Sequence, residues 1–424
     1  MLLSELKNRK VGMLVLVAAL GYFVDIYDLV LFGMERTNSL NDILGKTLAG
    51  DELKSAVKNT GISLLNIQMI GMLVGGIIWG IIGDKKGRLS VLFGSIITYS
   101  IANILNGMVT DTSTYAILRF VSGFGLAGEL GAGITLVSES MSKENRGWGT
   151  MIVASVGLCG AVVAGYVGEF INDWRWSYYI GGGMGLLLLL LRIGVYESGM
   201  FSEIKKSNVS RGNFLMLFRS GKQLMKYFNV ILVALPVWYV MGILITFCPE
   251  MGRAMGMPED MLPSPREAIK YAYIGITIGD VASGWLSQYL RSRKKALTVF
   301  LLLTVACVVL YFSVAAQSQT MFYIVCGVIG FATGFWAVFM SAASELFGTN
   351  IRSTVTTTAP NFVRGGTVLL TFLFQFFGTG LTFSLGWSNV TAAIITGVLT
   401  FTAAFYALWK LEETYGKDLN YTET

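Results

Sequence analysis

Histidine is missing from all 424 residues of the chain. It is the commonest metal ligand in proteins and the usual general base near neutral pH, so its absence excludes enzymes that depend on it. Charged residues are also scarce, because they make up 14% of the sequence against about 25% in a typical soluble domain. The chain therefore lacks the polar surface that would keep a soluble protein of this size dissolved.

The cysteines are few and show no functional spacing. Four are present, none in a C-x-x-C pattern: Cys159, Cys248, Cys307 and Cys326. Scattered positions of this kind in apolar segments predict neither a disulfide framework nor a metal site. A Gly-x-Ser-x-Gly motif is absent as well, so we expect neither an enzyme nor a bound cofactor.

Apolar residues dominate what is present. The AVILMFWYC set makes up 54% of the chain, and the mean hydropathy is +0.62. A helix that crosses a bilayer needs about 20 apolar residues. Twelve apolar runs of this kind can be found, at residues 11–34, 60–82, 90–109, 114–139, 148–171, 177–195, 227–249, 269–290, 296–315, 321–347, 353–380 and 388–409. The sequence therefore predicts an all-α integral membrane protein with twelve transmembrane helices.

The loop charges predict the orientation of the chain. An even number of spans places both termini on one side, and Lys and Arg concentrate in cytoplasmic loops. Of the 32 Lys and Arg residues, 22 fall on the side of the termini and eight on the other side. We therefore expect both termini in the cytoplasm. The net charge of +6 belongs to these loops, and no nucleic-acid partner is predicted from it.

The longest cytoplasmic loop divides the spans six and six. It covers residues 196–226, which leaves an N-terminal bundle at 1–195 and a C-terminal bundle at 227–424. Motifs recur between the two bundles. An offset of 206 positions relates Glu139 to Glu345, Arg146 to Arg352 and Gly128 to Gly334. Parallel six-helix repeats are typical of transporters built from two rocking halves.

A charged loop after the second run has the pattern Gly80-x3-Asp84-x2-Gly87-Arg88. Gly87 allows a tight turn between two membrane helices, while Asp84 can cap a neighbouring helix and pair with an arginine across the interface between the halves. A solvated basic turn is the alternative interpretation. In the second half Gln288 stands where Asp84 does, so an ionic contact there must differ.

This loop resembles the signature loop of the major facilitator superfamily. Other segments are similar to its sugar-porter and metabolite:proton symporter branches, and the first run is similar to phosphate:proton symporters and aromatic-acid carriers. These segments are Arg119-x3-Gly123-x-Gly125-x2-Gly128-Glu129, Glu139-x6-Arg146-Gly147, Tyr196-Glu197-Ser198 and Asp25-Ile26-Tyr27-Asp28-Leu29. The resemblance covers essentially the whole chain and implies the major facilitator fold with alternating access, but no particular cargo. Conformational gating is predicted for Gly80, Asp84, Gly87, Arg88, Glu139, Arg146, Glu345 and Arg352.

Two carboxylates lie inside the first run. An ionisable group at the centre of a membrane helix costs roughly 2.5–3.5 kcal/mol on insertion scales, so it usually faces a cavity or a partner. Asp25 and Asp28 are spaced i,i+3 and form one stripe with Tyr22. A desolvated carboxylate, or one of two close ones, can hold a proton near neutral pH. We predict proton coupling at Asp25 and Asp28, with Tyr22 at the substrate; the alternative for Asp28 is a hydrated position in the outer vestibule.

The fourth run contains Arg119 and Glu129. They are ten residues apart, or about 15 Å along the axis, which is too far for a direct pair. Arg119 is predicted to bind substrate or to pair with Asp25 or Asp28, where a proton or the substrate would break the pair and switch the conformation. A static clamp between helices is the alternative. Glu129, next to Gly128, is a second candidate for proton coupling.

Arg364 lies eleven residues into the eleventh run, about 17 Å from its start and close to the bilayer midplane. Transporters built from two halves bind their substrates at this depth. A guanidinium suits a carboxylate or phosphate, so we predict an anionic cargo. Asn361 and Thr357 extend a polar stripe on the same face and are predicted to bind it too. The structural alternative pairs Arg364 with Asp280 or Glu345.

Two more sites are predicted in the seventh and eighth runs. Asp280 is expected either to couple protons or to pair with Arg364 and hold two helices together. Pro236 is expected to break its helix beside the cavity, where Trp238 and Tyr239 would form an aromatic wall for the substrate. Packing against lipid or core is the alternative for both aromatic side chains.

These features predict a secondary active transporter in a bacterial-type inner membrane. It would take up a small organic anion together with protons, as a monomer whose partners are the substrate, protons and the lipid bilayer. The rival function is proton-driven export of a drug, metabolite or siderophore by the same carboxylates, since no motif encodes direction. A nutrient sensor would usually carry a long cytoplasmic domain, which this sequence does not contain.

Overall fold

The computed structural model describes residues 9–142, 145–171, 173–192, 221–348, 351–379, 381 and 383–417. These residues form helices and connecting turns, and no strand occurs among them. The linker predicted at 196–226 falls outside the described residues as far as residue 220, and so does the Tyr196-Glu197-Ser198 motif.

The first half of the chain, here called the N half, forms six spans. Its helices are α2 (Arg9–Leu44), α3 (Gly50–Lys86), α4 (Arg88–Asn106), α5 (Thr112–Leu126), α6 (Glu129–Ser140), α7 (Arg146–Phe170) and α8 (Trp174–Leu191). Helix α2 packs against α7, α8 and α6, so it borders both the interior of this half and the face that is turned toward the second half.

The second half, here called the C half, also forms six spans. Its elements are α10 (Gly221–Tyr239), the π-helix η3 (Val240–Ile245), α11 (Cys248–Ala254), the 3-10 helix η4 (Glu259–Met261), α12 (Pro265–Tyr289), α13 (Arg293–Val314), the 3-10 helix η5 (Ala315–Gln317), α14 (Gln319–Thr333), α15 (Trp336–Glu345), α16 (Arg352–Phe377) and α17 (Asn389–Lys410). The halves meet mainly where α16 packs against α3 and where α12 packs against α7.

Each of the twelve predicted runs corresponds to one helix or to helices placed end to end. In the described residues, nine of these segments are long and apolar enough to cross a membrane by length and composition. The remaining three are α8, α12 and α16, whose polar and charged residues lower their hydropathy.

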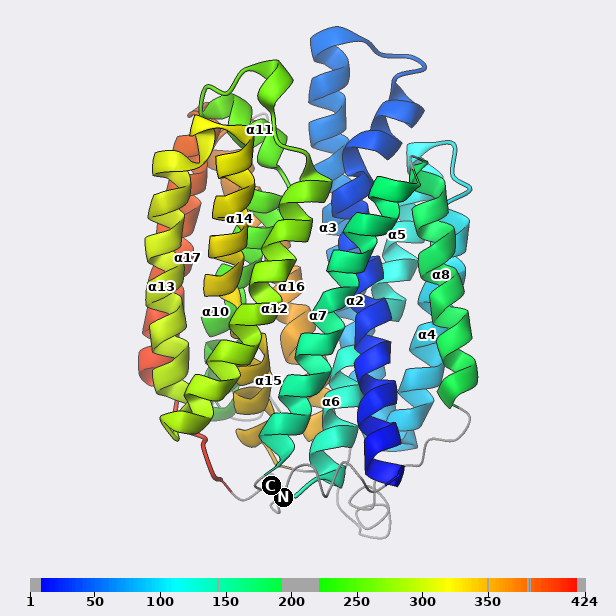
Figure 1. Cartoon of the computed structure of the whole chain (residues 1–424), viewed down its shortest axis with the longest axis vertical. Coiled ribbons are helices and arrows are strands. Elements are labelled where there is room, and N and C mark those ends of the chain that lie inside the picture. The colour runs from blue at the N-terminus through cyan, green and yellow to red at the C-terminus, as the bar shows by residue number, and fades with distance from the viewer. Residues whose placement is uncertain are drawn as a thin grey trace.

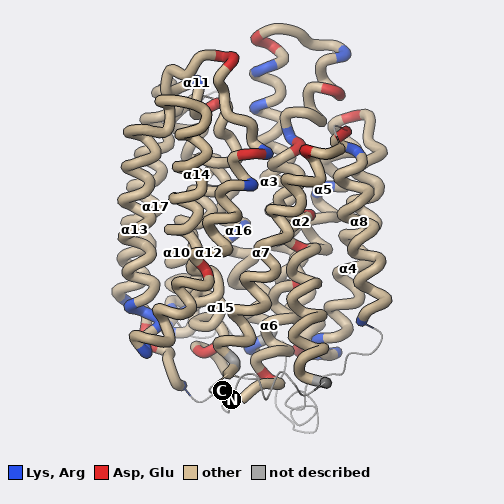
Figure 2. Tube along the Cα trace, viewed as in Figure 1, with Lys and Arg blue, Asp and Glu red and all other residues tan. Residues whose placement is uncertain are grey.

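The halves stand side by side with roughly parallel helices (Figure 1). Helix α2 begins and α17 ends at the same end of the molecule, which we call the terminal end; the other is the opposite end. Charged residues gather at the two ends, and few lie across the middle (Figure 2). This distribution is the one expected for a helical bundle that spans a bilayer.

Two helices extend beyond the predicted spans. The runs at 11–34 and 60–82 belong to helices that reach Leu44 and begin at Gly50, so both project at the opposite end (Figure 1). The polar residues on either side of the turn stay helical because they include the helix-favouring residues Leu, Lys and Glu and no proline. Between these two helices the chain turns at residues 45–49 and enters α3 at Gly50, which has a φ of 58°.

Spans four and ten are each interrupted at the glycine that recurs at the offset of 206 positions. Gly128 separates α5 from α6, and Gly334 separates α14 from α15. A Cβ at Gly334 would lie 2.6 Å from the backbone nitrogen of Asp280, so only glycine lets α12 approach this closely. The two breaks therefore occupy equivalent places in the two halves.

Candidate functional site

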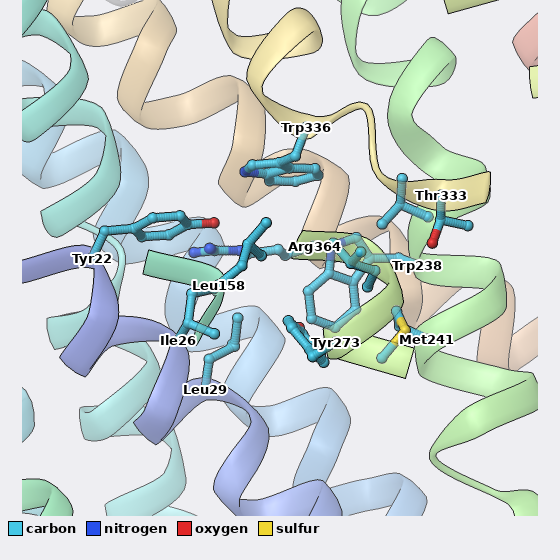
Figure 3. A pocket seen from close by; sticks show the side chains of 12 residues that line it. Tyr22, Ile26, Leu29, Leu158, Trp238, Met241, Tyr273, Thr333, Trp336 and Arg364 are labelled. Atoms are coloured by element: carbon cyan, nitrogen blue, oxygen red, sulfur yellow. The ribbon is translucent and has the colours of Figure 1, made fainter. Parts of the chain in front are cut away.

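A central cavity lies between the two halves, which touch each other at both ends of the molecule. Four aromatic side chains from four elements line it, Tyr22, Trp238, Tyr273 and Trp336, together with Arg364 and aliphatic side chains (Figure 3). Sequence reasoning found three of these residues. It missed the other two aromatics, because nothing in a local pattern shows which face of α12 or α15 turns inward.

Arg364 of the C half meets Asp25 of the N half at this cavity. Arg364 Nη2 lies 3.6 Å from Asp25 Oδ2, and both side chains are buried. Neither Nε nor Nη2 of Arg364, nor either oxygen of Asp25, has a hydrogen-bond partner in the described part of the chain. The hydroxyl of Tyr22 points toward the guanidinium (Figure 3). Arg364 therefore has a partner different from Asp280 and Glu345, the two weighed from the sequence.

Asp28 lies in a different environment from Asp25. A Cβ at Gly181 of α8 would lie 2.1 Å from Asp28 Oδ1, so this carboxylate points into the N half. Positions i and i+3 differ by about 60° around a helix axis, which is enough to separate the interface from the bundle interior. The prediction that Asp28 faces the same surroundings as Asp25 is therefore wrong, and so is its alternative of a hydrated vestibule, because Asp28 is fully buried. Proton coupling at Asp28 stays a prediction.

Arg119 also lies inside the N half and does not line the cavity. Its Cζ atom is 5.0 Å from the ring centroid of Phe32 and 5.9 Å from that of Tyr178. Asp28 lies within electrostatic range of it. The predicted contact between Arg119 and substrate is therefore contradicted in this conformation. None of the Arg119 nitrogens has a hydrogen-bond partner in the described part of the chain, so the predicted pair with Asp25 or Asp28 is not formed either.

Glu129 is held by an arginine that sequence reasoning missed. Arg192, just after α8, donates from Nη1 to Glu129 Oε1 at 2.9 Å and from Nη2 to Oε2 at 2.6 Å. Ser95 donates to the same carboxylate at 2.8 Å. Both partners belong to the N half, so Glu129, the first residue of the short α6, faces the interior of that half rather than the cavity.

Three predicted substrate residues face elsewhere. Asn361 donates to the backbone oxygen of Ala127 at 2.8 Å, so it holds α16 against the break in span four. Thr357 packs against Gly131, where a Cβ would lie 2.2 Å from its hydroxyl oxygen. Tyr239 donates to a backbone oxygen of α17 at 2.9 Å. The first two lie in a closed contact between the halves, and Tyr239 turns away because successive helical residues are about 100° apart.

Asp280 and Pro236 also differ from expectation. Asp280 Oδ1 accepts a hydrogen bond from the backbone N–H of Ala337 at 2.7 Å, so it caps the buried N-terminus of α15 and does not pair with Arg364, while proton coupling at Asp280 stays a prediction. Pro236 lies within α10, which continues to Tyr239. The irregular π-helical turn follows at η3, so the predicted break at the proline itself is wrong.

At the terminal end, Asp84 connects the halves. Its Oδ2 accepts hydrogen bonds from the backbone N–H of Thr354, at 2.8 Å, and from the Thr354 hydroxyl, so it caps α16 of the other half. Arg88 lies 3.6 Å from Asp84 and 2.9 Å from Glu139, all in the N half. The cap expected from the sequence is present, but among the described residues no arginine of the C half takes part in it. Gly80 allows the close approach, since its Cβ would lie 3.1 Å from Thr354 Cα.

The C half repeats part of this arrangement. Glu345 pairs with Arg293 at 3.0 Å, in the way that Glu139 pairs with Arg88. In the N half, the turn between α3 and α4 that precedes Arg88 requires glycine, because Gly87 has a φ of 104°. Each half therefore has a buried carboxylate–arginine pair at its terminal end.

The two remaining gating positions, and Gln288 in the place equivalent to Asp84, are accounted for as follows. Gln288 lies close to α7 of the other half, since a Cβ at Gly147 would lie 2.5 Å from its Nε2. Arg352 donates from Nε to the backbone oxygen of Ser344 at 3.2 Å. Arg146 begins α7, and its side chain lies outside the described residues.

Ion pairs between the halves close the opposite end. Sequence reasoning missed them because their residues lie beyond the apolar runs or at the edges of the runs. In the described residues four such pairs occur, Arg36 with Glu250 at 2.9 Å, Glu35 with Arg266 at 2.8 Å, Glu169 with Lys270 at 2.9 Å and the more exposed Lys54 with Glu259 at 3.5 Å.

Comparison with known proteins adds to this geometry. The sequence matches the family model described as Major Facilitator Superfamily over residues 18–369. A candidate niacin/nicotinamide transporter, NiaP, from Bacillus subtilis (strain 168) is 26% identical over 314 residues, 71% of this chain and 75% of that protein. The inner membrane metabolite transport protein YgcS from Escherichia coli (strain K12) is 26% identical over 373 residues, 80% of this chain and 76% of that protein.

A solved structure is similar over nearly the whole chain. The proton:xylose symporter XylE bound to 6-bromo-6-deoxy-D-glucose has a TM-score of 0.73 and 18% sequence identity, and the match covers 97% of this chain and 98% of that one. At this level of identity the likeness shows the fold alone. It confirms the prediction of twelve transmembrane helices in two six-helix halves.

Proposed function

The chain belongs to the major facilitator superfamily, and from that premise we propose that it takes up a small organic anion together with a proton. It is a multi-pass membrane transporter of metabolites, in keeping with the relatives that it matches. Its finer function is argued from the charges at the centre of the molecule.

The pair formed by Arg364 and Asp25 carries this proposal. The two residues come from different halves and meet at 3.6 Å beside the cavity. The carboxylate of an incoming anion is a better partner for the guanidinium than Asp25, because it can make two charge-assisted hydrogen bonds with the planar fork. Asp25 would then be buried without its counter-charge, and burial favours the neutral, protonated acid. Binding of the anion therefore promotes binding of a proton.

The same two residues predict the stoichiometry. A monoanion neutralises Arg364 and one proton neutralises Asp25, so the loaded cavity carries the same net charge as the empty one. One proton would accompany each anion, and transport would move no net charge. An imposed membrane potential without a pH gradient should therefore drive no accumulation.

Alternating access would use the closures at the two ends. Loss of the contact between Asp84 and Thr354 would open the cavity toward one side. Loss of the ion pairs of Glu35 and Arg36 would open it toward the other. Both closures are made in this structure, with the cavity between them, which suits an occluded step of the cycle. Transporters of this architecture rock one half against the other around a central site.

Relatives and loop charges support the remaining assignments. The similarity to an inner membrane metabolite transport protein and to a candidate niacin/nicotinamide transporter fits a small metabolite as cargo. We further propose a bacterial-type inner membrane, with both termini in the cytoplasm because 22 of 32 Lys and Arg residues lie on their side. The two halves supply every residue of the cavity, so one copy of the chain suffices for transport.

Reconstitution tests the function directly. Purified full-length protein is first screened for thermal stabilisation by benzoate, lactate, citrate, phosphate, xylose and a quaternary ammonium ion, because a ligand of the folded state raises the apparent stability. A radiolabelled hit is then offered to proteoliposomes with an inward proton gradient. Accumulation that requires the gradient, and that vesicles without protein lack, is expected. If only phosphate, xylose or the cation stabilises the protein, the proposal is wrong.

A further inference from the structure

Three buried hydrogen-bond donors at the central cavity have no acceptor in the described part of the chain. They are Nε and Nη2 of Arg364 and the indole Nε1 of Trp336. Arg364 is 1% exposed and Trp336 is 4% exposed. Buried donors in folded proteins are nearly always paired, so a cargo that supplies acceptor oxygens at this point completes the site. The Cζ of Arg364 is 5.9 Å from the Trp336 ring centroid, which brings these donors together.

The rest of the lining offers little to a polar molecule. Apart from the phenol groups and the hydroxyl of Thr333, the cavity is walled by aliphatic or sulfur-containing side chains: Ile26, Leu29, Leu158, Val237, Met241 and Ile276. A sugar or a second carboxylate would be buried against these groups without hydrogen bonds, which is unfavourable. The cavity has a volume of only about 20 Å³ in this conformation, so the halves must separate to admit a cargo, and the lining then suits a molecule with one charged end and an apolar body.

The shape of that body follows from the aromatic side chains. Tyr22, Trp238, Tyr273 and Trp336 come from α2, α10, α12 and α15, so their rings surround Arg364 from several directions (Figure 3). Aromatic rings attract other rings in offset-stacked or edge-to-face contacts. A flat ring also needs less space between such faces than a puckered, saturated ring of the same size.

We propose that the cargo is a flat aromatic monocarboxylate, an inference that rests on the proposed uptake of an organic anion and narrows its substrate class. The carboxylate takes hydrogen bonds from Arg364 and from the indole N–H of Trp336. The ring lies against the faces of Trp238 and Tyr273. Trp336 and Trp238 thus determine specificity, one through its N–H group and the other through its surface.

Binding to the purified full-length protein tests this. Benzoate is compared with cyclohexanecarboxylate, which has the same charge and ring size but is not flat, and with benzamide, which is flat but neutral. We expect benzoate to bind roughly three- to tenfold more tightly than cyclohexanecarboxylate, the ratio that one aromatic contact supplies. Benzamide should bind at least as weakly as cyclohexanecarboxylate, because it lacks the charge that Arg364 requires.

Variants separate the two roles. Trp238→Leu should abolish the preference for benzoate over cyclohexanecarboxylate while both still bind. Trp336→Phe keeps a ring and removes the N–H, so it should weaken both carboxylates by a similar factor and leave their ratio unchanged. Tyr239→Phe is the matched control, because Tyr239 is adjacent to Trp238 but faces α17, and it should change neither affinity. Thermal unfolding of each variant shows that it is folded.

The outcomes distinguish this inference from the function on which it rests. Equal or tighter binding of cyclohexanecarboxylate, with both acids still dependent on Arg364, overturns the aromatic class and leaves anion uptake intact. A folded Trp336→Phe protein with unchanged affinity for both acids overturns the indole donor. If no carboxylate binds at all, the proposed function itself has failed.

Discussion

Asp25 and Asp28 are one turn apart on the same helix, yet they lie in unlike surroundings. Asp25 faces Arg364 of the C half across the central cavity, 3.6 Å away. Asp28 points into the N half, beside Gly181 and within electrostatic range of Arg119. All of these charged side chains are buried. The two sites therefore differ in which halves they join, not in depth.

This difference has a mechanical meaning. When the halves rock, the distance between Arg364 and Asp25 must change, because the two residues belong to different bodies. Arg119 and Asp28 move together, since α2 and α5 are parts of one half. A charge pair can respond to the transport cycle only if the cycle alters its geometry, so we assign coupling to Asp25 and a structural role to Asp28.

Removing the carboxylate at the interface should have the largest effect. Asp25→Asn cannot bind and release a proton, so gradient-driven accumulation of benzoate in proteoliposomes should be abolished. Exchange of internal for external benzoate needs no net proton movement and should persist. Accumulation at the level of the unmodified protein would remove Asp25 from the mechanism.

Asp28→Asn is the matched control for that change, because it makes the same substitution three residues away. We expect it to lower the amount of folded protein and to leave accumulation per folded molecule within about twofold of normal, since Asp28 does not touch the cavity. Loss of accumulation in a well-folded Asp28→Asn protein would contradict the division of roles between the two carboxylates.

Replacing the interface arginine should have the next largest effect. Arg364→Lys keeps the positive charge but loses the planar fork, so benzoate affinity should fall roughly 10- to 100-fold, or about 1.4–2.8 kcal/mol. Titration calorimetry measures this loss. Arg119→Lys is the control, and it should leave affinity unchanged. Equal affinities in the two variants would show that Arg364 does not bind the anion.

Removing a charge inside the N half should affect stability rather than transport. Arg119 and Asp28 make no hydrogen bond with each other in the described part of the chain, but they interact through space where both are buried. An uncompensated buried charge typically costs up to about 3–5 kcal/mol. Arg119→Leu should therefore lower the unfolding temperature strongly. The double variant Arg119→Leu/Asp28→Asn should recover much of that loss, since no buried charge remains. Additive losses in the double variant would show that the two residues do not interact.

A smaller effect is expected from the space around Asp28. Gly181→Ala places a Cβ about 2 Å from Asp28 Oδ1, so the carboxylate or α8 must shift, at a typical cost of about 1–3 kcal/mol. Gly183→Ala lies on the same helix with nothing within 4 Å of the added Cβ and should be close to neutral. Thermal unfolding distinguishes the two. Similar unfolding temperatures would mean that Asp28 does not pack against α8 in this way.

The smallest effect on stability is expected from a solvent-exposed ion pair, which serves as a reference for the buried charges. Hydrogen bonds from Arg253 lower the pKa of Glu259 from 4.5 to about 2. A carboxylate with a lowered pKa adds stability above its ordinary pKa and loses it as the pH falls toward 2. Glu259→Gln should therefore lower the unfolding temperature slightly, by an amount that stays constant between pH 8 and pH 5 and narrows only as the pH falls from about 4.5 toward 2. A difference that varies between pH 8 and pH 5 would contradict this.

The depth of the central charges could be predicted from the sequence, but their partners could not. Asp25 and Arg364 stand out because charged groups inside apolar runs are costly and therefore rarely accidental. Which of them meet depends on rotation about each helix and on contacts between helices hundreds of residues apart. The pairing of Glu129 with Arg192 illustrates this, because Arg192 closes a run of leucines and carries no local signal.

The ends of the helices were predicted least well. Glu35 and Arg36 lie beyond the first apolar run, so the sequence assigns them to a loop, although α2 continues for another eight residues. Hydropathy measures where lipid would contact the chain and not where hydrogen bonding along the backbone stops. For the same reason the glycine breaks in spans four and ten were recognised as repeats before their effect on the helices could be foreseen.

Because α2 is a single helix of 36 residues, one rigid rod joins the centre of the molecule to its outer seal. Arg36 follows Asp25 by eleven residues, or about 17 Å along the axis. If that rod tilts by about 10° around Asp25, Arg36 is carried sideways by about 3 Å on this lever arm, which is enough to separate it from Glu250. A small tilt of α2 at the cargo site would then separate Arg36 from Glu250 at the opposite end of the molecule. No chain of intermediate side chains would be needed to transmit the change.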